Sequence, residues 1–225
     1  LYVQNTTGKF TKSNQKVFTQ DKLCEDLGVL FFDYDQDGDM DMYLLNHSIH
    51  TLNSYGNSTL RVKSDALAGD ILYENITENG QIKFVDVTTQ AGIYNSSLGY
   101  GLALATSDVN NDGLLDIYVG NDFHENDYLY INNGNKTFTE SSSDYFNHTS
   151  RFTMGVDIAD ISNDGKPDII TLDMMPNRAD VFLKSGGEDT DKVSQIKKSF
   201  GYHQQYARNH LQLSPLCYLK VAYVL

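Results

Sequence analysis

The sequence is poor in cysteine, in basic residues and in long apolar runs, and each shortage excludes a class of protein. Among 225 residues there are only two cysteines, Cys24 and Cys217, too few for a scaffold held by disulfide bonds. Lysine and arginine number 17 against 30 acidic residues, and the net charge of −13 opposes binding to nucleic-acid phosphates. The apolar stretch 215–225 is far shorter than the roughly 20 residues of a membrane helix. We therefore expect no nucleic-acid partner and no membrane span in this segment.

Aspartate, by contrast, recurs in three loops of one pattern, Asp33–Asp41, Asp108–Asp116 and Asp160–Asp168. Each loop has an oxygen-bearing side chain at positions 1, 3 and 5, a glycine at position 6 and an Asp at position 9. Calcium takes 6 to 8 oxygen ligands, and the glycine allows a sharp turn around the ion. The sequence therefore predicts about three Ca2+ ions. The predicted ligands, which include the carbonyl at position 7, are Asp33, Asp35, Asp37, Asp39, Asp41, Asp108, Asn110, Asp112, Leu114, Asp116, Asp160, Ser162, Asp164, Lys166 and Asp168.

The segments that flank the loops have the composition of strands. They are Gly28–Phe32, Ala103–Ser107 and Gly155–Ala159 before the loops, and Met42–Leu45, Ile117–Gly120 and Ile169–Leu172 after them. An EF-hand would have flanking helices and a Glu at position 12, where this chain has Leu44, Val119 or Thr171. Dockerin-like modules also place helices beside their loops, and thrombospondin-type repeats contain many cysteines. EF-hands, dockerin-like modules and thrombospondin-type repeats are therefore excluded.

Each unit also has a second half, in which a Leu-containing strand is followed by a Phe-containing strand. These halves are Leu72–Asn75 with Phe84–Thr89, Leu129–Gly134 with Phe138–Glu140, and Leu1–Asn5 with Phe10–Thr11, which stands alone. A complete unit is then four strands, as one blade of a β-propeller requires. The predicted fold is all-β: a β-propeller fragment of about three four-stranded blades plus half of a preceding one. Calcium loops lie between strands one and two, and there is a short helical insertion.

With these motifs the chain resembles the FG-GAP (VCBS-type) repeat propellers, which include the calcium-binding blades of the integrin alpha head. The chain is more similar to the secreted cartilage-acidic-protein and UnbV group. The residues that carry the likeness are Gly99–Gly101, Asp116–Asp122, Leu129–Gly134 and Phe84–Gly92. The resemblance implies a propeller with bound calcium. It implies no particular activity, because the group is known mainly as repeat domains of unassigned role.

The repeat divides the chain into four segments. Residues 1–27 are expected to be the closing strands of a preceding blade, 28–98 a blade with an insertion at 46–70, 99–151 a blade without one, and 152–225 a blade with an insertion at about 174–208 and an atypical tail. After Leu213 the repeat predicts Asn-Asn-Gly and a Phe strand, so we expect Ser214 to begin something unrelated. The chain opens in the middle of a unit at Leu1, and we expect it to be cut from a longer chain that carries the remaining blades.

Both insertions occupy the connection between strands two and three, so they are expected to project from one face, often the binding face of a repeat protein. In the later insertion, apolar residues of Thr190–Phe200 recur at helical spacing. Thr190 or Asp191 can cap the start of this helix, and Gly201 can end it.

Polar side chains collect in the connections of this insertion face, and all six histidines are expected there. The side chains singled out are His47, His50, Asn121, Asp122, His124, Glu125, His148, Arg151, Tyr202, His203, Tyr206 and Arg208. A composite site could bind a sugar or a second metal through imidazole, carboxylate and aromatic groups. Alternatively, these side chains satisfy exposed turns and carbonyls between blades. No His/Asp/Glu spacing matches a known transition-metal motif.

The sequence predicts an extracellular calcium-binding repeat module for ligand or protein interaction, with structural calcium and no enzyme activity in this segment. Extracellular modules bind calcium with a Kd of about 10⁻⁴–10⁻³ M, which favours a secreted or cell-surface location, or a periplasmic one. The alternative is part of a secreted carbohydrate-active or glycan-binding protein with its site on the insertion face. A glycosidase carboxylate pair stays open among 30 acidic residues, whereas no Gly-x-Ser-x-Gly elbow is present. A third option is adhesion to a protein partner in the integrin manner.

Overall fold

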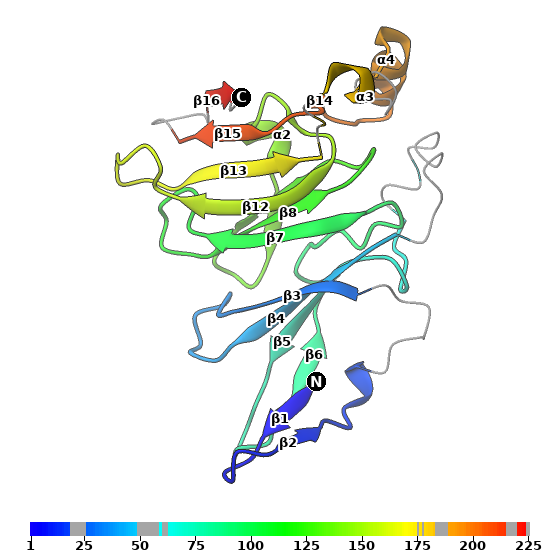
Figure 1. The fold of residues 1–225 in the computed structure, drawn as a ribbon. Helices are drawn as coiled ribbons and strands as arrows, with labels where there is room; N and C mark the ends of the chain where they lie inside the picture. Colours follow the sequence, from blue (N-terminus) through cyan, green and yellow to red (C-terminus); the bar gives the residue numbers. More distant parts are fainter. Residues whose placement is uncertain are drawn as a thin grey trace.

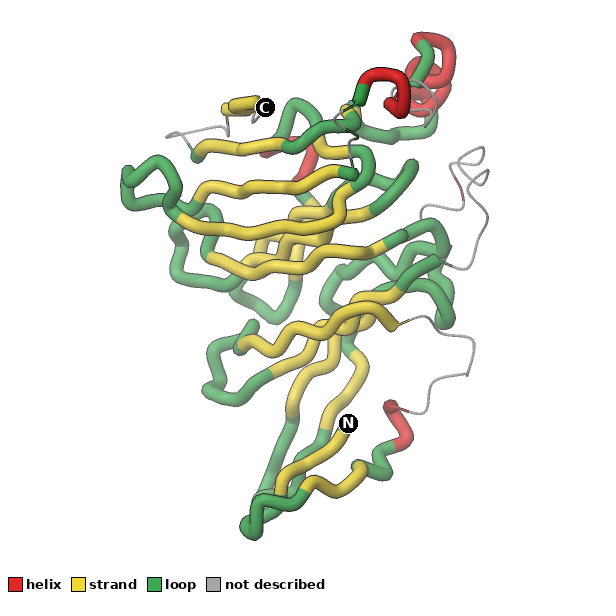
Figure 2. The backbone as a smooth tube through the Cα atoms, viewed as in Figure 1, coloured by secondary structure: helices red, strands yellow, loops and turns green. Residues whose placement is uncertain are grey.

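The fold was analysed in a computed structural model that describes residues 1–18, 26–48, 59, 63–174, 176, 178–182, 189–214 and 220–223. Its regular structure is mostly antiparallel β, with a few short helices gathered mainly at one corner (Figures 1 and 2). The predictions made for Cys24, Cys217 and His50 concern residues outside this described part of the chain. No helix in the described part is long and apolar enough to cross a membrane.

Three four-stranded sheets follow one another along the chain. The first contains β3 (Asp26–Phe32), β4 (Asp41–Asn46), β5 (Ile71–Asn75) and β6 (Phe84–Asp86). The second contains β7 (Gly101–Ser107), β8 (Asp116–Asn121), β9 (Tyr128–Asn132) and β10 (Phe138–Glu140). The third contains β12 (Thr153–Ala159), β13 (Asp168–Asp173), β15 (His210–Leu213) and β16 (Lys220–Tyr223). Within each sheet the strands are antiparallel neighbours in chain order, and no sheet closes on itself.

In every sheet an Asp loop joins the first strand to the second. The last paired residues before the loop are Phe32↔Asp41, Ser107↔Asp116 and Ala159↔Asp168, so the ninth Asp always opens the second strand. All three loops lie along one side of the molecule, at the left in Figure 1, and helices α3 (Ala179–Phe182) and α4 (Asp191–Ser199) lie on the other. The loops and the insertion are therefore at opposite ends of the strands.

The smaller elements belong to the connections and to the N-terminal segment. β1 (Tyr2–Gln4) and β2 (Phe10–Lys12) form a hairpin, followed by the short helix η1 (Lys16–Phe18). Helix α2 (Ser142–Tyr145) follows β10, and β11 (Thr149–Ser150) pairs in parallel with β14 (Gln205–Tyr206).

Helix α4 agrees with the prediction for the later insertion. The Thr190 side chain accepts a hydrogen bond from the Val193 N–H at 3.4 Å, as a helix N-cap does. Gly201 follows the helix with φ +82°, a backbone conformation that favours glycine. The cap and the terminating glycine therefore set the bounds of this helix.

Successive sheets pack face to face through their alternating apolar residues. One core cluster joins the first and second sheets and includes Tyr43, Leu45, Leu72, Ile117 and Tyr130, all at most 1% exposed. Burying one such side chain contributes roughly 1.5–3 kcal/mol. A second cluster joins the second and third sheets, and a third packs the N-terminal segment on the outer face of the first sheet. The alternation expected of strands thus buries both faces of the second sheet, whereas the outer faces of the first and third sheets stay partly exposed.

Two glycines allow the inner strands of neighbouring sheets to approach closely. A Cβ added to Gly101 of β7 would overlap Leu45 of β4, and a Cβ added to Gly120 of β8 would overlap Thr153 of β12. Neither residue has positive φ, so lack of space alone selects glycine at these two contacts.

Each end of this stack presents apolar side chains to solvent. On β3, Leu27, Val29 and Phe31 are 52%, 52% and 47% exposed. At the other end, Leu172 of β13 and the following Met174 are 50% and 56% exposed. The arrangement is an open series of face-packed sheets, which agrees with a repeat-containing β fold. The predicted blade boundaries and the assignment of the sheets to a β-propeller fragment stay predictions.

The prediction for the C-terminal tail was wrong. Lys220–Tyr223 is β16, which pairs antiparallel with β15 as the fourth strand of the third sheet, in the register Leu213↔Lys220. The tail lacks the Asn-Asn-Gly and Phe signals of the other units. A strand edge, however, pairs through main-chain groups, so a segment containing Val221 and Tyr223 can complete the sheet.

Candidate metal centre

The three Asp loops share one backbone conformation. In each loop the residues at positions 4 and 6 have positive φ, between +58° and +94°. These residues are Gln36, Asn111 and Asn163 at position 4, and Gly38, Gly113 and Gly165 at position 6. No atom lies within 4 Å of a Cβ added at the three glycines. Conformation rather than crowding therefore requires glycine here, and two left-handed residues make each loop curl.

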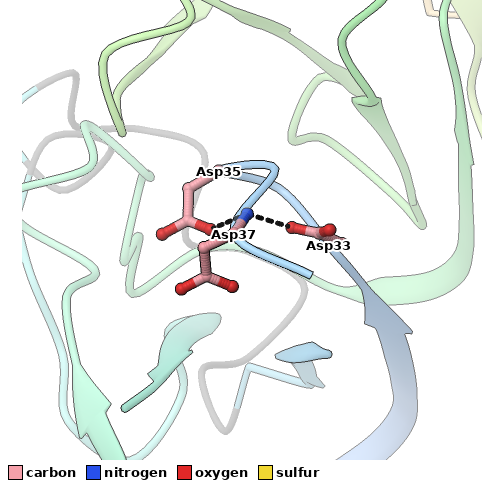
Figure 3. A group of neighbouring side chains, drawn as sticks. All are labelled: Asp33, Asp35 and Asp37. Atoms are coloured by element: carbon pink, nitrogen blue, oxygen red, sulfur yellow. Dashed lines mark hydrogen bonds between the residues drawn. The ribbon is translucent and has the colours of Figure 1, made fainter. Parts of the chain in front are cut away.

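The first loop brings three carboxylates together. Asp33, Asp35 and Asp37 each offer an oxygen within 4.8 Å of the other two (Figure 3). The Asp37 N–H donates to Asp33 Oδ1 at 3.2 Å and to Asp35 Oδ1 at 3.3 Å. These main-chain bonds hold the two side chains toward the centre of the loop, at the spacing that a hard cation with oxygen ligands requires.

Asp39, at position 7, adds a fourth acidic side chain to this loop. Its Oδ1 is buried and has no hydrogen-bond partner. Burial, and then the nearby carboxylates of Asp37, Asp35 and Asp33, raise the pKa of Asp39. A buried acceptor without a donor among like charges is unfavourable, and a cation bound among the carboxylates would supply the missing partner. The residues of the first loop therefore fit calcium.

The ninth Asp of each loop has a different local role. Asp41 is 1% exposed, and its two oxygens accept the Tyr34 N–H at 3.1 Å and the Asn75 N–H at 2.8 Å. Asp116 does the same with Val109 and Asn132, both at 2.8 Å. This carboxylate therefore joins the loop to the end of the third strand. Carboxylate oxygens have further lone pairs, so these contacts leave capacity for a metal ion.

Burial sets the charge of these ninth carboxylates in the absence of metal. It raises the pKa of Asp41 to about 7 and that of Asp116 to about 6, although the two N–H donors of each oppose the shift. At Asp168 burial also disfavours the charge, but the donors Ser214, Ser162 and Ile161 outweigh it and lower the pKa. Of the carboxylates at position 9 of the three loops, that of Asp168 is consequently the most readily ionised.

The first two loops are linked to each other and to a basic side chain. Lys136 Nζ lies 2.6 Å from Asp35 Oδ2 and 2.6 Å from the Glu74 carboxylate, although the lysine side chain is 53% exposed. Gln36 Nε2 donates to the Gly113 carbonyl at 2.7 Å. The cluster in the first loop thus contacts residues of the second unit, and the Lys136 ammonium partly neutralises it.

The second and third loops contain fewer acidic side chains. In the second loop, Asn110 takes the place of Asp35 and donates through Nδ2 to Asp112 Oδ2 at 2.8 Å. In the third, Ser162 takes that place, and its main-chain N–H donates to Asp168 Oδ2 at 2.7 Å. Within the described ranges, only the first loop gathers three ionisable groups at metal-ligand spacing. The full set of predicted calcium ligands stays a prediction in all three loops.

The polar residues predicted to share the insertion face are divided among several places. His47 packs edge-on against Tyr100, with ring centroids 4.6 Å apart. His148 contacts the rings of Tyr206 and His210 at 5.0 and 4.9 Å. Glu125, Tyr202 and His203 line one cavity. Arg151 forms an ion pair with Asp189 at 2.8 Å.

The prediction that every histidine lies in a connection was wrong for His210. It opens strand β15 and is completely buried, and burial lowers its pKa to about 4. The alignment of Leu211 with Leu129 in the repeat carried the signal, because it places the preceding residue inside the strand.

A buried acid immediately before the third strand was not predicted from the sequence. Asp70 and Asp127 each stand two residues before the Leu of that strand, and both are buried. The Tyr43 hydroxyl donates to Asp70 at 2.9 Å, and the Tyr118 hydroxyl donates to Asp127 at 2.7 Å. The signal was present, because Asp-x-Leu occurs in both units with a Tyr ten residues after the first loop Asp.

Comparison with protein families matches residues 108–171 to the FG-GAP-like repeat. The match begins at the first Asp of the second loop and ends in β13, after the ninth Asp of the third. The chain therefore contains an FG-GAP-like repeat. No curated protein matches the sequence. The repeat supports a module for protein interaction.

Proposed function

We propose that this chain is a calcium-stabilised interaction module, in which calcium has a structural role. The observation that carries the proposal is the first loop, where three Asp carboxylates converge within 4.8 Å and a fourth, Asp39, has a buried oxygen without a donor. Calcium bound there would neutralise mutually repelling groups, and it would bind only the folded loop. The repeated backbone of the other two loops extends the proposal to about three ions.

Calcium at these positions would stabilise the connections of each sheet. The loop joins strands one and two, and its ninth Asp also accepts an N–H from the end of strand three, as Asp41 does from Asn75. A bound ion would therefore fix three strands at the loop end of each sheet. The opposite end of the strands, where the insertion lies, would remain available for ligand or protein contact.

We infer further that the sheets are consecutive blades of a β-propeller similar to those of the integrin alpha head and of the cartilage-acidic-protein and UnbV group. The support is the face-to-face packing, together with exposed apolar residues on β3 and β13, where further sheets could pack. Calcium of the moderate affinity expected for such loops favours an extracellular, cell-surface or periplasmic location. The proposed role is binding rather than catalysis.

The test is calcium-dependent unfolding of the whole chain, with bound metal counted by mass spectrometry. At a calcium concentration 100 times the Kd, each filled site should add about 2.7 kcal/mol to the free energy of unfolding. Asp33→Asn combined with Asp37→Asn should remove one bound ion and about that much stabilisation, again about 2.7 kcal/mol. Asp157→Asn, an exposed Asp outside the loops, is the matched control.

An unfolding midpoint that is equal in calcium and in chelator, with no metal retained, would contradict the structural role of calcium. Equal calcium stabilisation of the double variant and the parent would contradict the assignment to the first loop.

A further inference from the structure

A cavity of about 430 Å³ lies between the second unit and the insertion of the third. Its walls come from the β6–β7 connection (Tyr94), the β8–β9 connection (Glu125), the end of β10 and the start of α2 (Glu140, Ser142), and the segment after α4 (Phe200, His203). This volume is within the range of small-molecule sites. The cavity lies at the end of the strands opposite the Asp loops, so it is separate from the candidate metal centre.

Hydrogen bonds hold the two sides of this cavity together. The His203 N–H donates to Asn126 Oδ1 at 2.9 Å, and Gln205 Nε2 donates to the Glu125 carbonyl at 2.8 Å. Lys197 of α4, which is almost fully buried, donates to Gln205 Oε1 at 2.6 Å and pairs with Asp189 at 3.2 Å. The insertion is therefore fixed against the second unit by buried polar contacts, and the cavity is a built feature of the fold.

An aromatic ring stands exposed at this cavity. Tyr94 is 44% exposed, yet its ring packs edge-on against Tyr128 and Tyr130, with centroids 5.6 and 6.1 Å away. Its main-chain N–H also donates to the Tyr130 hydroxyl at 3.1 Å. Both neighbouring tyrosines are at most 2% exposed. Tyr94 is thus a rigid aromatic surface that faces solvent, and such a ring binds apolar faces of a ligand at little entropic cost.

Two carboxylates and one imidazole are among the described polar side chains that line the cavity. Glu140 Oε1 accepts the Ser142 N–H at 2.8 Å and the Leu129 N–H at 3.3 Å, and Glu125 Oε1 accepts the Asn126 N–H at 3.0 Å. These main-chain bonds orient both carboxylates and partly satisfy them. Glu140, which is partly exposed, therefore offers acceptor capacity to a ligand with hydroxyl groups, whereas Glu125 is buried.

We propose that this cavity is a binding site for a neutral sugar, with the pyranose ring stacked on Tyr94 and its hydroxyls bonded to the Glu140 carboxylate. No lysine or arginine is among the described residues that line the cavity, so an anionic sugar or phosphate would be repelled by the Glu140 carboxylate. A cationic amine would bind these two carboxylates less strongly than it would bind free carboxylates, because both already accept hydrogen bonds from main-chain N–H groups. The inference rests on the proposed function, since it gives the interaction module one location and one ligand class.

The experiment is saturation-transfer NMR of the whole chain in calcium with cellobiose, lactose, mannobiose and chitobiose. Glucuronate and choline serve as the anionic and cationic comparators. We expect at least one neutral disaccharide to receive saturation. Tyr94→Ala should weaken its binding roughly two- to tenfold, which is the contribution of one aromatic contact. Ser143→Trp, at an exposed position in the lining, should abolish binding by filling the cavity. Tyr2→Ala removes another exposed tyrosine, outside this cavity, and should have no effect.

Three results would overturn the proposal: binding of glucuronate or choline in preference to every neutral sugar, neutral-sugar binding that survives both Tyr94→Ala and Ser143→Trp, or the absence of any sugar binding. The calcium-dependent unfolding midpoint is measured on the same samples, so a failure of the sugar site is distinguishable from a failure of the proposed calcium module. Release of monosaccharide during the experiment would contradict the non-catalytic role.

Discussion

The buried carboxyl of Asp127 should make the stability of this protein fall as the pH rises through neutrality. Asp127 accepts hydrogen bonds from Tyr118 Oη at 2.7 Å, Thr153 Oγ1 at 2.9 Å and the Asn121 N–H at 2.8 Å. Burial nevertheless raises its pKa from 3.8 to about 7, because these donors do not replace the lost hydration of the charge. The folded chain therefore retains a proton that the unfolded chain has released.

The sign and size of the effect follow from proton linkage. The pKa of Asp127 is higher in the folded chain than in the unfolded chain. Its contribution to the free energy of unfolding is therefore complete below pH 3.8 and is lost as the pH rises through 7. From pH 6.5 to 8.0, a group with a folded pKa near 7 should lose about 1 kcal/mol of unfolding free energy. His148, His203 and His210 have lowered pKa values in the folded chain, so their contributions to stability increase over this window, and they cancel when a variant is compared with the parent.

The perturbation that isolates this carboxyl is Asp127→Asn. An amide is compatible with the site, because Asn209 occupies the same position in the third sheet and accepts the Asp173 N–H at 2.8 Å. Urea unfolding of the parent and the variant at pH 6.5 and at pH 8.0 gives the difference at each pH. Contributions from Asp70, whose pKa burial also raises to about 7, cancel in this comparison.

We expect the advantage of the parent over Asp127→Asn to be about 1 kcal/mol smaller at pH 8.0 than at pH 6.5. Asp157→Asn, which changes an exposed residue of β12, should give the same difference at both pH values. If the Asp127→Asn difference is also independent of pH, the carboxyl does not titrate near neutrality and the reasoning from burial is refuted.

Three further predictions test the loops and the packing. Lys136→Met should tighten calcium binding at the first loop by about 1 kcal/mol, because the ammonium 2.6 Å from Asp35 competes with the ion; calorimetry showing unchanged or weaker binding would contradict this. The Asp160 loop should fill last in a calcium titration followed by NMR, since Ser162 is neutral and Lys166 is basic; filling before the Asp108 loop would refute the ranking. Gly120→Val should destabilise the chain by about 1–3 kcal/mol in urea unfolding, because its side chain would overlap Thr153. Gly155→Ala is the control, because its nearest neighbour is 3.8 Å from the added Cβ, and an equal loss in both variants would show that packing is not the cause.

Much of the local structure could be predicted from sequence because the loop motif fixes residue positions. The ninth Asp opens β4, β8 and β13, so the strand, its partner and its register follow from the spacing alone. Helix α4 was predictable for a similar reason, since its cap and its terminating glycine are adjacent in sequence to the apolar pattern. These features depend on short-range chemistry.

Features built from distant segments could not be predicted in this way. The sugar-sized cavity joins Tyr94, Glu125 and His203, and nothing in their spacing indicates that they meet. Lys136 lies about a hundred residues after Asp35, and only the packing of neighbouring sheets brings the two together. The fourth strand of the third sheet was missed because main-chain pairing does not require the motif that marks it elsewhere.

The third sheet shows how the repeat changes while its main-chain geometry is kept. Where the second sheet pairs Tyr118 with Asp127, the third has Ile170 and Asn209, so the hydroxyl and the carboxylate are lost together. A buried carboxylate without its hydroxyl donor would be less well satisfied, so the loss of both is less unfavourable than the loss of one. The main-chain contact remains, since Asn209 still accepts the N–H at the end of the second strand.

In the third sheet an acid lies at the end of the second strand instead of before the third strand. Asp173 stands where Asn121 stands in the second sheet, and it accepts the Ser150 hydroxyl at 2.6 Å and the Phe152 N–H at 3.0 Å. Ser150 belongs to β11, which pairs with β14 on the return of the insertion. The Asp173 carboxylate therefore holds β11, and β14 of the insertion pairs with this strand. That insertion forms one wall of the proposed sugar site, so the contacts of Asp173 support the position of this wall.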